Sequence, residues 1–108
     1  MLVIALGTLK TFLEKQRGRR DYPALKAAVE AWYAEAKRAQ WAGPADVKGR
    51  YASASIINAE RVVFNLKGND FRLIVAISYP HRIVWIKWIG THRDYDKVDA
   101  RSVEYESD

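Results

Sequence analysis

The spacing of apolar residues changes at Arg61, and this change restricts the fold more than any other feature of the chain. Beyond it, apolar residues recur at every second position in three segments: Val62, Phe64 and Leu66; Phe71, Leu73, Val75, Ile77 and Tyr79; and Val84, Ile86 and Trp88. A period of two is typical of strands that bury one face. Three such strands joined by short connections predict an antiparallel sheet.

The sequence before Arg61 predicts helices instead. The clearest helical spacing is that of Leu25, Val29, Trp32, Tyr33 and Ala36, with Pro23 in the first turn. We expect a strand over Leu2–Leu6 and helices over Leu9–Gln16, from an Asp21 N-cap to about Gln40, and over 45–51. The prediction is a single α+β domain, residues 1–108. A short N-terminal strand leads into two to three helices packed on one face of a twisted antiparallel C-terminal sheet, and a short C-terminal helix follows.

The composition limits the classes of function. The 108 residues include 18 Lys and Arg against 13 Asp and Glu, a net charge of +5 and a pI near 9.6, which favours a polyanionic partner. Cysteine is absent, which excludes disulfides and thiolate chemistry. The apolar start is short for a secretory peptide, and Lys87 interrupts the longest apolar run. We therefore expect a cytoplasmic protein with no membrane span.

The first hairpin places cations on one face of the sheet. Gly68-Asn69 is a good two-residue turn, because glycine tolerates a positive φ. This turn pairs Lys67 with Asp70 and Asn65 with Arg72, and directly paired residues share a face. Asn65, Lys67 and Arg72 are then expected together on the face opposite the helices.

The second hairpin is expected to turn at Pro80-His81. A two-residue loop pairs Ile74 with Lys87, which places Lys87 on the face of Arg72; a three-residue loop would reverse this. The hydrophobic pattern favours the first register. That register groups Val84, Ile86 and Trp88 with the core and leaves Ile83, Trp85 and Ile89 beside the cations. A face with cations and aromatic rings suits single-stranded RNA, and the alternative is a solvated sheet face.

His92 and Tyr95 follow the third strand and lie one helical turn apart if this segment is helical. RNA cleavage by its own 2′-hydroxyl needs a base, an acid and positive charge near the transition state. A histidine, a tyrosine and neighbouring cations can meet these needs, although a lone histidine is more often structural. The other histidine, His81, lies in a predicted turn, and Asp94, Asp96 and Asp99 lie on one solvated stretch. We expect no metal site.

Four segments resemble the HigB family of bacterial toxins, within the RelE-like superfamily: WYAEAKRAQW, ADVKGRYASASII, RVVFNLKGNDFRLIVAISY and WIGTHRDYDKVDA. The similarity covers nearly the whole chain, from near Met1 to about Ala100. It implies a RelE-like fold and a ribosome-dependent mRNA endonuclease that inhibits translation. It also implies a helix-turn-helix, HigA-like antitoxin that neutralises the toxin and represses the shared operon.

The resemblance also implies roles for individual residues. His92 and Tyr95 are expected to transfer protons, with the assignment of acid and base left open, and Arg72 and Lys87 to complete the catalytic set. The expected RNA-binding residues are Asn65, Lys67, Asn69, Arg61 and Arg93; Asn69 is equally well explained as a structural turn residue. Asp94 and Asp96 are candidates to orient their basic neighbours.

The expected partners are mRNA in the ribosomal A site, rRNA and the antitoxin, with operator DNA contacted only through the antitoxin. No cofactor is expected. The alternative function is a non-catalytic binder related to RelE and ParE, either a gyrase inhibitor or a partner-binding corepressor subunit.

Overall fold

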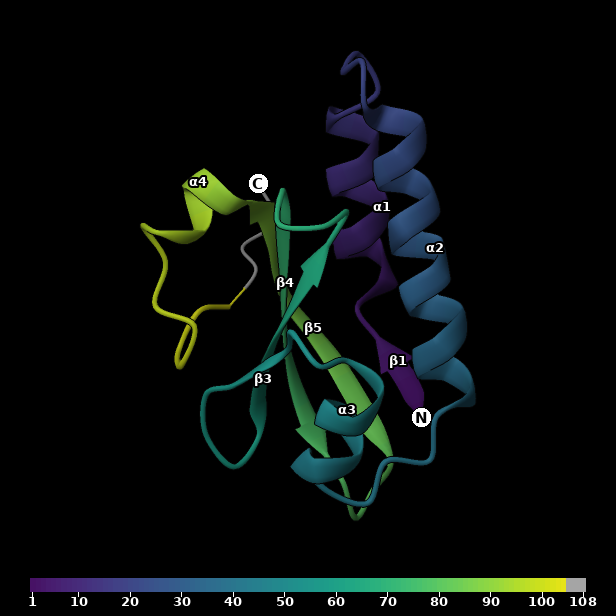
Figure 1. The fold of residues 1–108 in the computed structure, drawn as a ribbon, viewed down its shortest axis with the longest axis vertical. Coiled ribbons are helices and arrows are strands. Elements are labelled where there is room, and N and C mark those ends of the chain that lie inside the picture. The colour runs from purple at the N-terminus through teal and green to yellow at the C-terminus, as the bar shows by residue number, and fades with distance from the viewer. Residues whose placement is uncertain (105–108) are drawn as a thin grey trace.

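The computed structural model describes residues 1–104, and their elements form an α+β fold (Figure 1). The elements are β1 (Leu2–Ile4), α1 (Leu6–Lys15), α2 (Tyr22–Arg38), α3 (Pro44–Arg50), β2 (Ser55–Ile56), β3 (Arg61–Leu66), β4 (Phe71–Ser78), β5 (Ile83–Thr91) and α4 (His92–Tyr95). The five-stranded sheet has the order β1-β5-β4-β3-β2, in which β1 is parallel to β5 and the other pairs are antiparallel. The predicted fold class is confirmed, and β2 is an additional short strand.

The N-terminal elements differ from prediction in their limits. β1 ends at Ile4 because Ala5 has a φ of 73°, and α1 begins at once with Leu6. Asp21 precedes α2 as predicted, but its side chain makes no capping hydrogen bond. Its carboxylate instead pairs with Arg19 at 2.8 Å, and the hydrogen bond from Arg19 lowers the pKa of Asp21. Asp21 therefore occupies the predicted N-cap position, but its side chain does not cap the helix.

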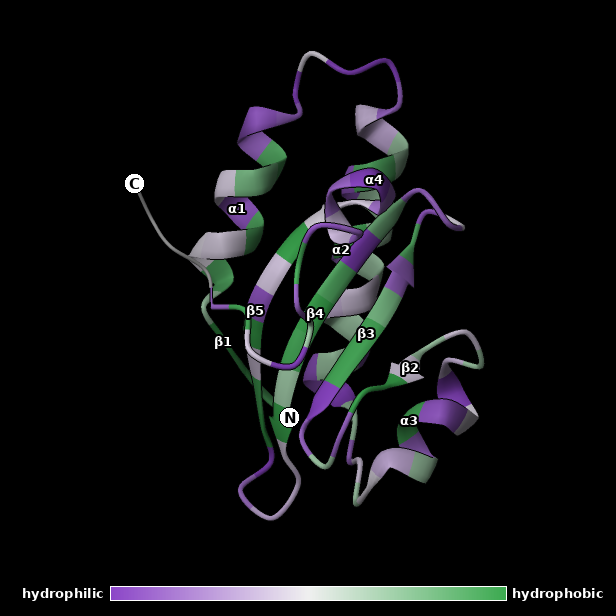
Figure 2. Ribbon diagram, turned by 90° about the vertical axis from the view of Figure 1, so that its left-hand side faces the viewer, coloured by the Kyte–Doolittle hydropathy of each residue, from purple (hydrophilic) through white to green (hydrophobic). Residues whose placement is uncertain are grey.

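The main core lies between the sheet and the helices α1 and α2, which cover one face of it (Figure 1). At its centre Phe64 of β3 packs against Trp32 of α2, with ring centroids 5.4 Å apart, and against Trp41 and Tyr51 at 6.1 and 5.1 Å. Val47 brings α3 into the same core. Strands β3 and β4 are hydrophobic over most of their lengths (Figure 2), because they bury both faces.

The β3–β4 hairpin has the predicted register, with Asn65 opposite Arg72 and Phe64 opposite Leu73. Gly68 has the expected positive φ, 65°, but Lys67 also has one, 50°. The strand thus ends at Leu66, and the Lys67 side chain leaves the outer face. Its amine lies 2.7 Å from Asp70 and 3.5 Å from Asp21, beside the helical layer. The predicted position of Lys67 with Asn65 and Arg72 is wrong.

The β4–β5 pairing contains a β-bulge that the sequence pattern did not predict. The hairpin turns at Pro80-His81 as expected, with Arg82 N donating to Tyr79 O. Val75 pairs with Ile86, but Ile74 pairs with Trp88, so Lys87 is an extra residue. The predicted pairing of Ile74 with Lys87 is therefore wrong.

Two side chains change faces beyond the bulge. Ile89, expected beside the cations, is buried in the main core, whereas Trp88, expected in the core, turns to the outer face. On the outer face Trp88 packs against a second small cluster that includes Ile74 and Val63.

The chain after α4 covers part of this outer face. Val98, Ala100 and Val103 pack against the second cluster, on the side of the sheet away from α1 and α2 (Figure 1). Within residues 1–104, no helix is long and apolar enough to cross a membrane.

Candidate active site

Arg72 is the centre of the site. It lies near the start of β4, opposite Asn65 on β3 and Gly90 on β5. Its guanidinium donates to Asn69 O at 2.7 Å and to Phe71 O at 3.2 Å, while its Nη2 lies 2.8 Å from His92 Nδ1. Across residues 1–104 these contacts include no carboxylate, so the charge of Arg72 is available to an anion.

His92 begins α4, directly after β5. Two hydrogen bonds hold this helix: His92 N donates to Asp70 O at 2.9 Å, and Asp94 N donates to Thr91 Oγ1 at 3.1 Å. Because a guanidinium only donates, His92 Nδ1 must accept the bond from Arg72, and Nε2 carries the ring proton in this arrangement. The exposed ring is thus positioned by Arg72 and fixed backbone contacts.

Tyr95 completes the cluster from one turn further along α4. Its ring centroid lies 5.8 Å from Arg72 Cζ, a cation–π distance, and 6.4 Å from that of Trp88. The structure therefore brings together Arg72, His92 and Tyr95, as the sequence predicted. Trp88 is an aromatic neighbour that the sequence analysis had assigned to the core.

Two asparagines border the cluster. Asn65 Nδ2 lies 3.3 Å from Asn69 Oδ1 and 3.5 Å from Ser53 O. Asn69 O in turn accepts from Arg72. Asn69 therefore has a structural role in the β3–β4 turn, and its exposed side chain lies beside the catalytic candidates.

The other predicted cations lie elsewhere. Lys67 pairs with Asp70, whose hydrogen bond raises the pKa of Lys67. Arg61, opposite Ala76 on β4, is roughly 13 Å along the strand from Arg72, at about 3.3 Å per residue. It is 8% exposed, too buried for a phosphate contact. Arg93 on α4 is exposed, and the hydrogen bonds of Arg72 within residues 1–104 do not include it.

Glu104 forms ion pairs with Lys87 and Arg61, two cations that were predicted to contact RNA. Its carboxylate lies 2.9 Å from Lys87 Nζ and 3.0 Å from Arg61 Nη2, and Arg61 also donates to Val103 O at 2.7 Å. The hydrogen bond from Lys87 is the main cause of the lowered pKa of Glu104. The acidic sequence after Val103 is the signal that could have indicated this pairing. Residues 105–108 lie outside the described residues.

The cluster offers side chains that can exchange protons and bind an anion. Among residues 1–104, no group of three or more His, Asp or Glu side chains is placed to hold a metal ion. Asp94 and Asp96 are exposed, and neither takes part in an ion pair within residues 1–104.

Comparison with known proteins identifies the family. Residues 25–98, more than half of the chain, match the family described as HigB toxin, RelE-like toxic component of a toxin-antitoxin system. No curated protein matches the chain. The matched segment includes α2 from Leu25 onward, the whole β3–β5 meander and the cluster of Arg72, His92 and Tyr95. The chain therefore belongs to the HigB family of RelE-like toxins.

Proposed function

We propose that this toxin is a ribosome-dependent endoribonuclease that cleaves mRNA in the ribosomal A site and thereby inhibits translation. The observation that carries the proposal is the 2.8 Å contact between Arg72 Nη2 and His92 Nδ1, beside the ring of Tyr95. A cation without a carboxylate partner and two groups that exchange protons are the requirements of metal-independent RNA cleavage.

In the proposed reaction the ribose 2′-oxygen loses its proton and attacks the adjacent phosphorus. The bond from phosphorus to the 5′-oxygen breaks, and the leaving oxygen takes up a proton. The products are a 2′,3′-cyclic phosphate and a 5′-hydroxyl end. Arg72 stabilises the extra negative charge on the phosphoryl oxygens in the transition state.

The contact between Arg72 and His92 suggests how substrate prepares the base. Nδ1 of His92 is occupied by Arg72 in the free protein. A phosphate offers a guanidinium two oxygens in a matching geometry. When Arg72 turns to the phosphate, Nδ1 becomes available to accept the proton of the 2′-hydroxyl, and the hydroxyl of Tyr95 is the donor to the leaving oxygen.

The openness of the site supports dependence on the ribosome. His92 and Asn69 are exposed to solvent, so the described residues leave the site open on this side. The 2′-oxygen must nevertheless lie in line with the bond that breaks, and such alignment accounts for much of the rate of a reaction of this kind. We propose that the ribosome holds the codon in line, that exposed Arg93 contacts rRNA, and that the protein acts in the cytoplasm.

Membership in a toxin–antitoxin family implies a cognate antitoxin. We propose a small helix-turn-helix partner that neutralises the toxin with an acidic or apolar segment over the basic face or the adjacent helices. Operator DNA would be contacted only through this partner. A complex in which the antitoxin touches neither surface would contradict the proposal.

The test uses in vitro translation of a defined mRNA, with 5′ ends mapped by primer extension in the presence and absence of ribosomes. His92→Ala is compared with the wild type and with His81→Ala, a matched control in the β4–β5 turn, where His81 contacts Ser78 Oγ. We expect the wild type and the control to cleave only on ribosomes. We expect His92→Ala to cleave at least about 10²-fold more slowly than the wild type.

Two outcomes would contradict the proposal. Cleavage by His92→Ala at the wild-type rate would show that the site is assigned wrongly. If the wild type cleaves no RNA and its expression blocks DNA replication, the chain is a non-catalytic binder.

A further inference from the structure

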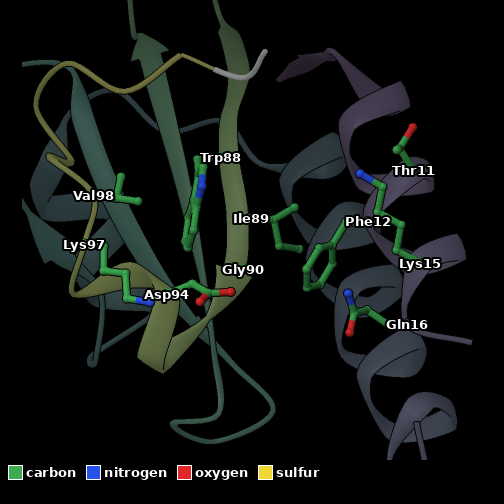
Figure 3. A pocket seen from close by; sticks show the side chains of 10 residues that line it. All are labelled: Thr11, Phe12, Lys15, Gln16, Trp88, Ile89, Gly90, Asp94, Lys97 and Val98. Carbon is green, nitrogen blue, oxygen red and sulfur yellow. The ribbon is translucent and has the colours of Figure 1, made fainter. Parts of the chain in front are cut away.

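A groove runs along the part of β5 that β1 does not cover. β1 pairs only with Ile83 to Trp85, so the edge of β5 beyond them faces α1 across a gap. This groove has a volume of about 430 Å³, within the range of about 300–1,000 Å³ typical of small-ligand sites. Figure 3 shows its walls, with Phe12, Lys15 and Gln16 from α1 on one side and Trp88, Asp94 and Lys97 on the other.

The groove begins where the active-site cluster ends. Trp88 lines the groove and also lies 6.4 Å from the ring of Tyr95, which in turn contacts Arg72. Asp94 also lines the groove and lies on α4 with His92. A nucleotide whose phosphate is held by Arg72 therefore has a neighbouring base within reach of this groove.

The side chains of the groove match the chemistry of a nucleobase. Phe12 and Trp88 offer apolar ring surface against which a base can stack. Gln16 donates and accepts hydrogen bonds, and the carboxylate of Asp94 accepts them from amino or imino groups. Lys15 and Lys97 are exposed cations at the groove and suit backbone phosphates.

The local backbone departs from regular strand geometry in the way that creates this wall. The bulge at Lys87 turns Trp88 out of the core. The Trp88 ring then lies against Gly90, where an added Cβ would meet ring atoms at 2.4 and 2.5 Å. A bulge and a glycine both weaken a strand and are common beside functional sites. The bulge and Gly90 together allow the Trp88 ring to lie between the active-site cluster and the groove.

We propose that this groove binds a nucleobase of the RNA adjacent to the cleaved phosphate and sets the base preference of cleavage, with Asp94 and Gln16 reading the edge of the base. The inference rests on the proposed endoribonuclease function and adds the specificity site to it. A protein strand added to the free edge of β5 is the competing occupant; the contact with the active-site cluster through Trp88 and the mixed polar lining favour RNA.

The first test measures base preference. Single-turnover cleavage is followed on ribosomes programmed with A-site codons that differ by one base, using the wild type, Asp94→Asn, Gln16→Ala and the matched control Asp96→Asn, which lies at the end of the same helix and outside the groove. Asn can donate where Asp94 only accepts. We expect Asp94→Asn to change the ratio of cleavage rates between two bases by roughly tenfold, which corresponds to the loss of one hydrogen bond to a charged group. We expect Asp96→Asn to preserve the wild-type ratios. Wild-type ratios in both groove variants would overturn the inference and leave the proposed function standing.

The second test needs no cleavage and so separates the two proposals. The indole N–H signal of Trp88, assigned from its loss in Trp88→Phe, is followed by NMR while a trinucleotide with 2′-deoxy sugars is added. We expect a saturating shift of this signal in the wild type and a weaker affinity in Gln16→Ala. If the wild type fails to cleave RNA but shows this shift, only the proposed function is wrong. A signal that stays unchanged with the trinucleotide, whether or not the purified antitoxin shifts it, would overturn the RNA site.

Discussion

Gly90→Ala tests the packing of Trp88 that joins the active-site cluster to the groove. An added Cβ would lie 2.4 Å from one ring atom of Trp88 and 2.5 Å from another, whereas carbon atoms in contact are about 3.5–4.0 Å apart. The rigid ring must therefore move by roughly 1 Å. Overpacking of this kind costs about 1–3 kcal/mol, while replacing glycine in a strand gains roughly 0.5–1 kcal/mol.

We therefore expect Gly90→Ala to lower the free energy of unfolding by about 1–2 kcal/mol in urea denaturation, and Tm by roughly 5–10 °C. Gly49→Ala is the matched control, because an added Cβ there meets nothing within 4 Å. Trp88→Ala removes the clashing ring, so in that background Gly90→Ala should cost little. An equal loss in both backgrounds, or no loss in either, would refute the reasoning.

Further predictions concern the C-terminal segment. Arg61→Ala removes a side chain that is 8% exposed and bonded to Glu104 and Val103 O; we expect a loss of about 1–3 kcal/mol in urea denaturation, and a wild-type midpoint would contradict this contact. Glu104 has a pKa below its ordinary value of 4.5, first because of Lys87 and then Arg61. Its stabilisation should be complete above about pH 4.5 and vanish as pH falls through the lower folded-state pKa. Unfolding measured from pH 3 to 7 should show the wild type losing its advantage over Glu104→Gln in acid; a constant difference between the two would exclude this ion pair as the cause.

The sequence predicted the first hairpin because a glycine turn and a period of two determine its register together. Asn65 pairs with Arg72 as expected, and this pairing leads to the cluster with His92 and Tyr95. The same reasoning misplaced Lys67, because the alternation was extended by one residue into a turn where Lys67 has a positive φ.

The bulge in β5 could not be predicted from periodicity. Trp88 and Ile89 are both apolar, so either register buries an apolar residue in the core, and the pattern does not distinguish them. The extra residue, Lys87, is polar, so the hydrophobic pattern does not assign it to the core in either register. Nor did the pattern show that Glu104 pairs with Lys87 and Arg61, since contacts between segments distant in sequence depend on where the C-terminal segment crosses the sheet.

The most direct test of the central claim compares alanine substitutions of two cations, one inside the active-site cluster and one outside it. Single-turnover cleavage of ribosome-bound mRNA is measured for Arg72→Ala, whose side chain contacts His92, and for Lys67→Ala, whose side chain pairs with Asp70 and Asp21. We expect Arg72→Ala to lower the rate by about 10²-fold or more, and Lys67→Ala to change it by no more than about threefold. A large loss in Lys67→Ala with an unchanged rate in Arg72→Ala would contradict the account.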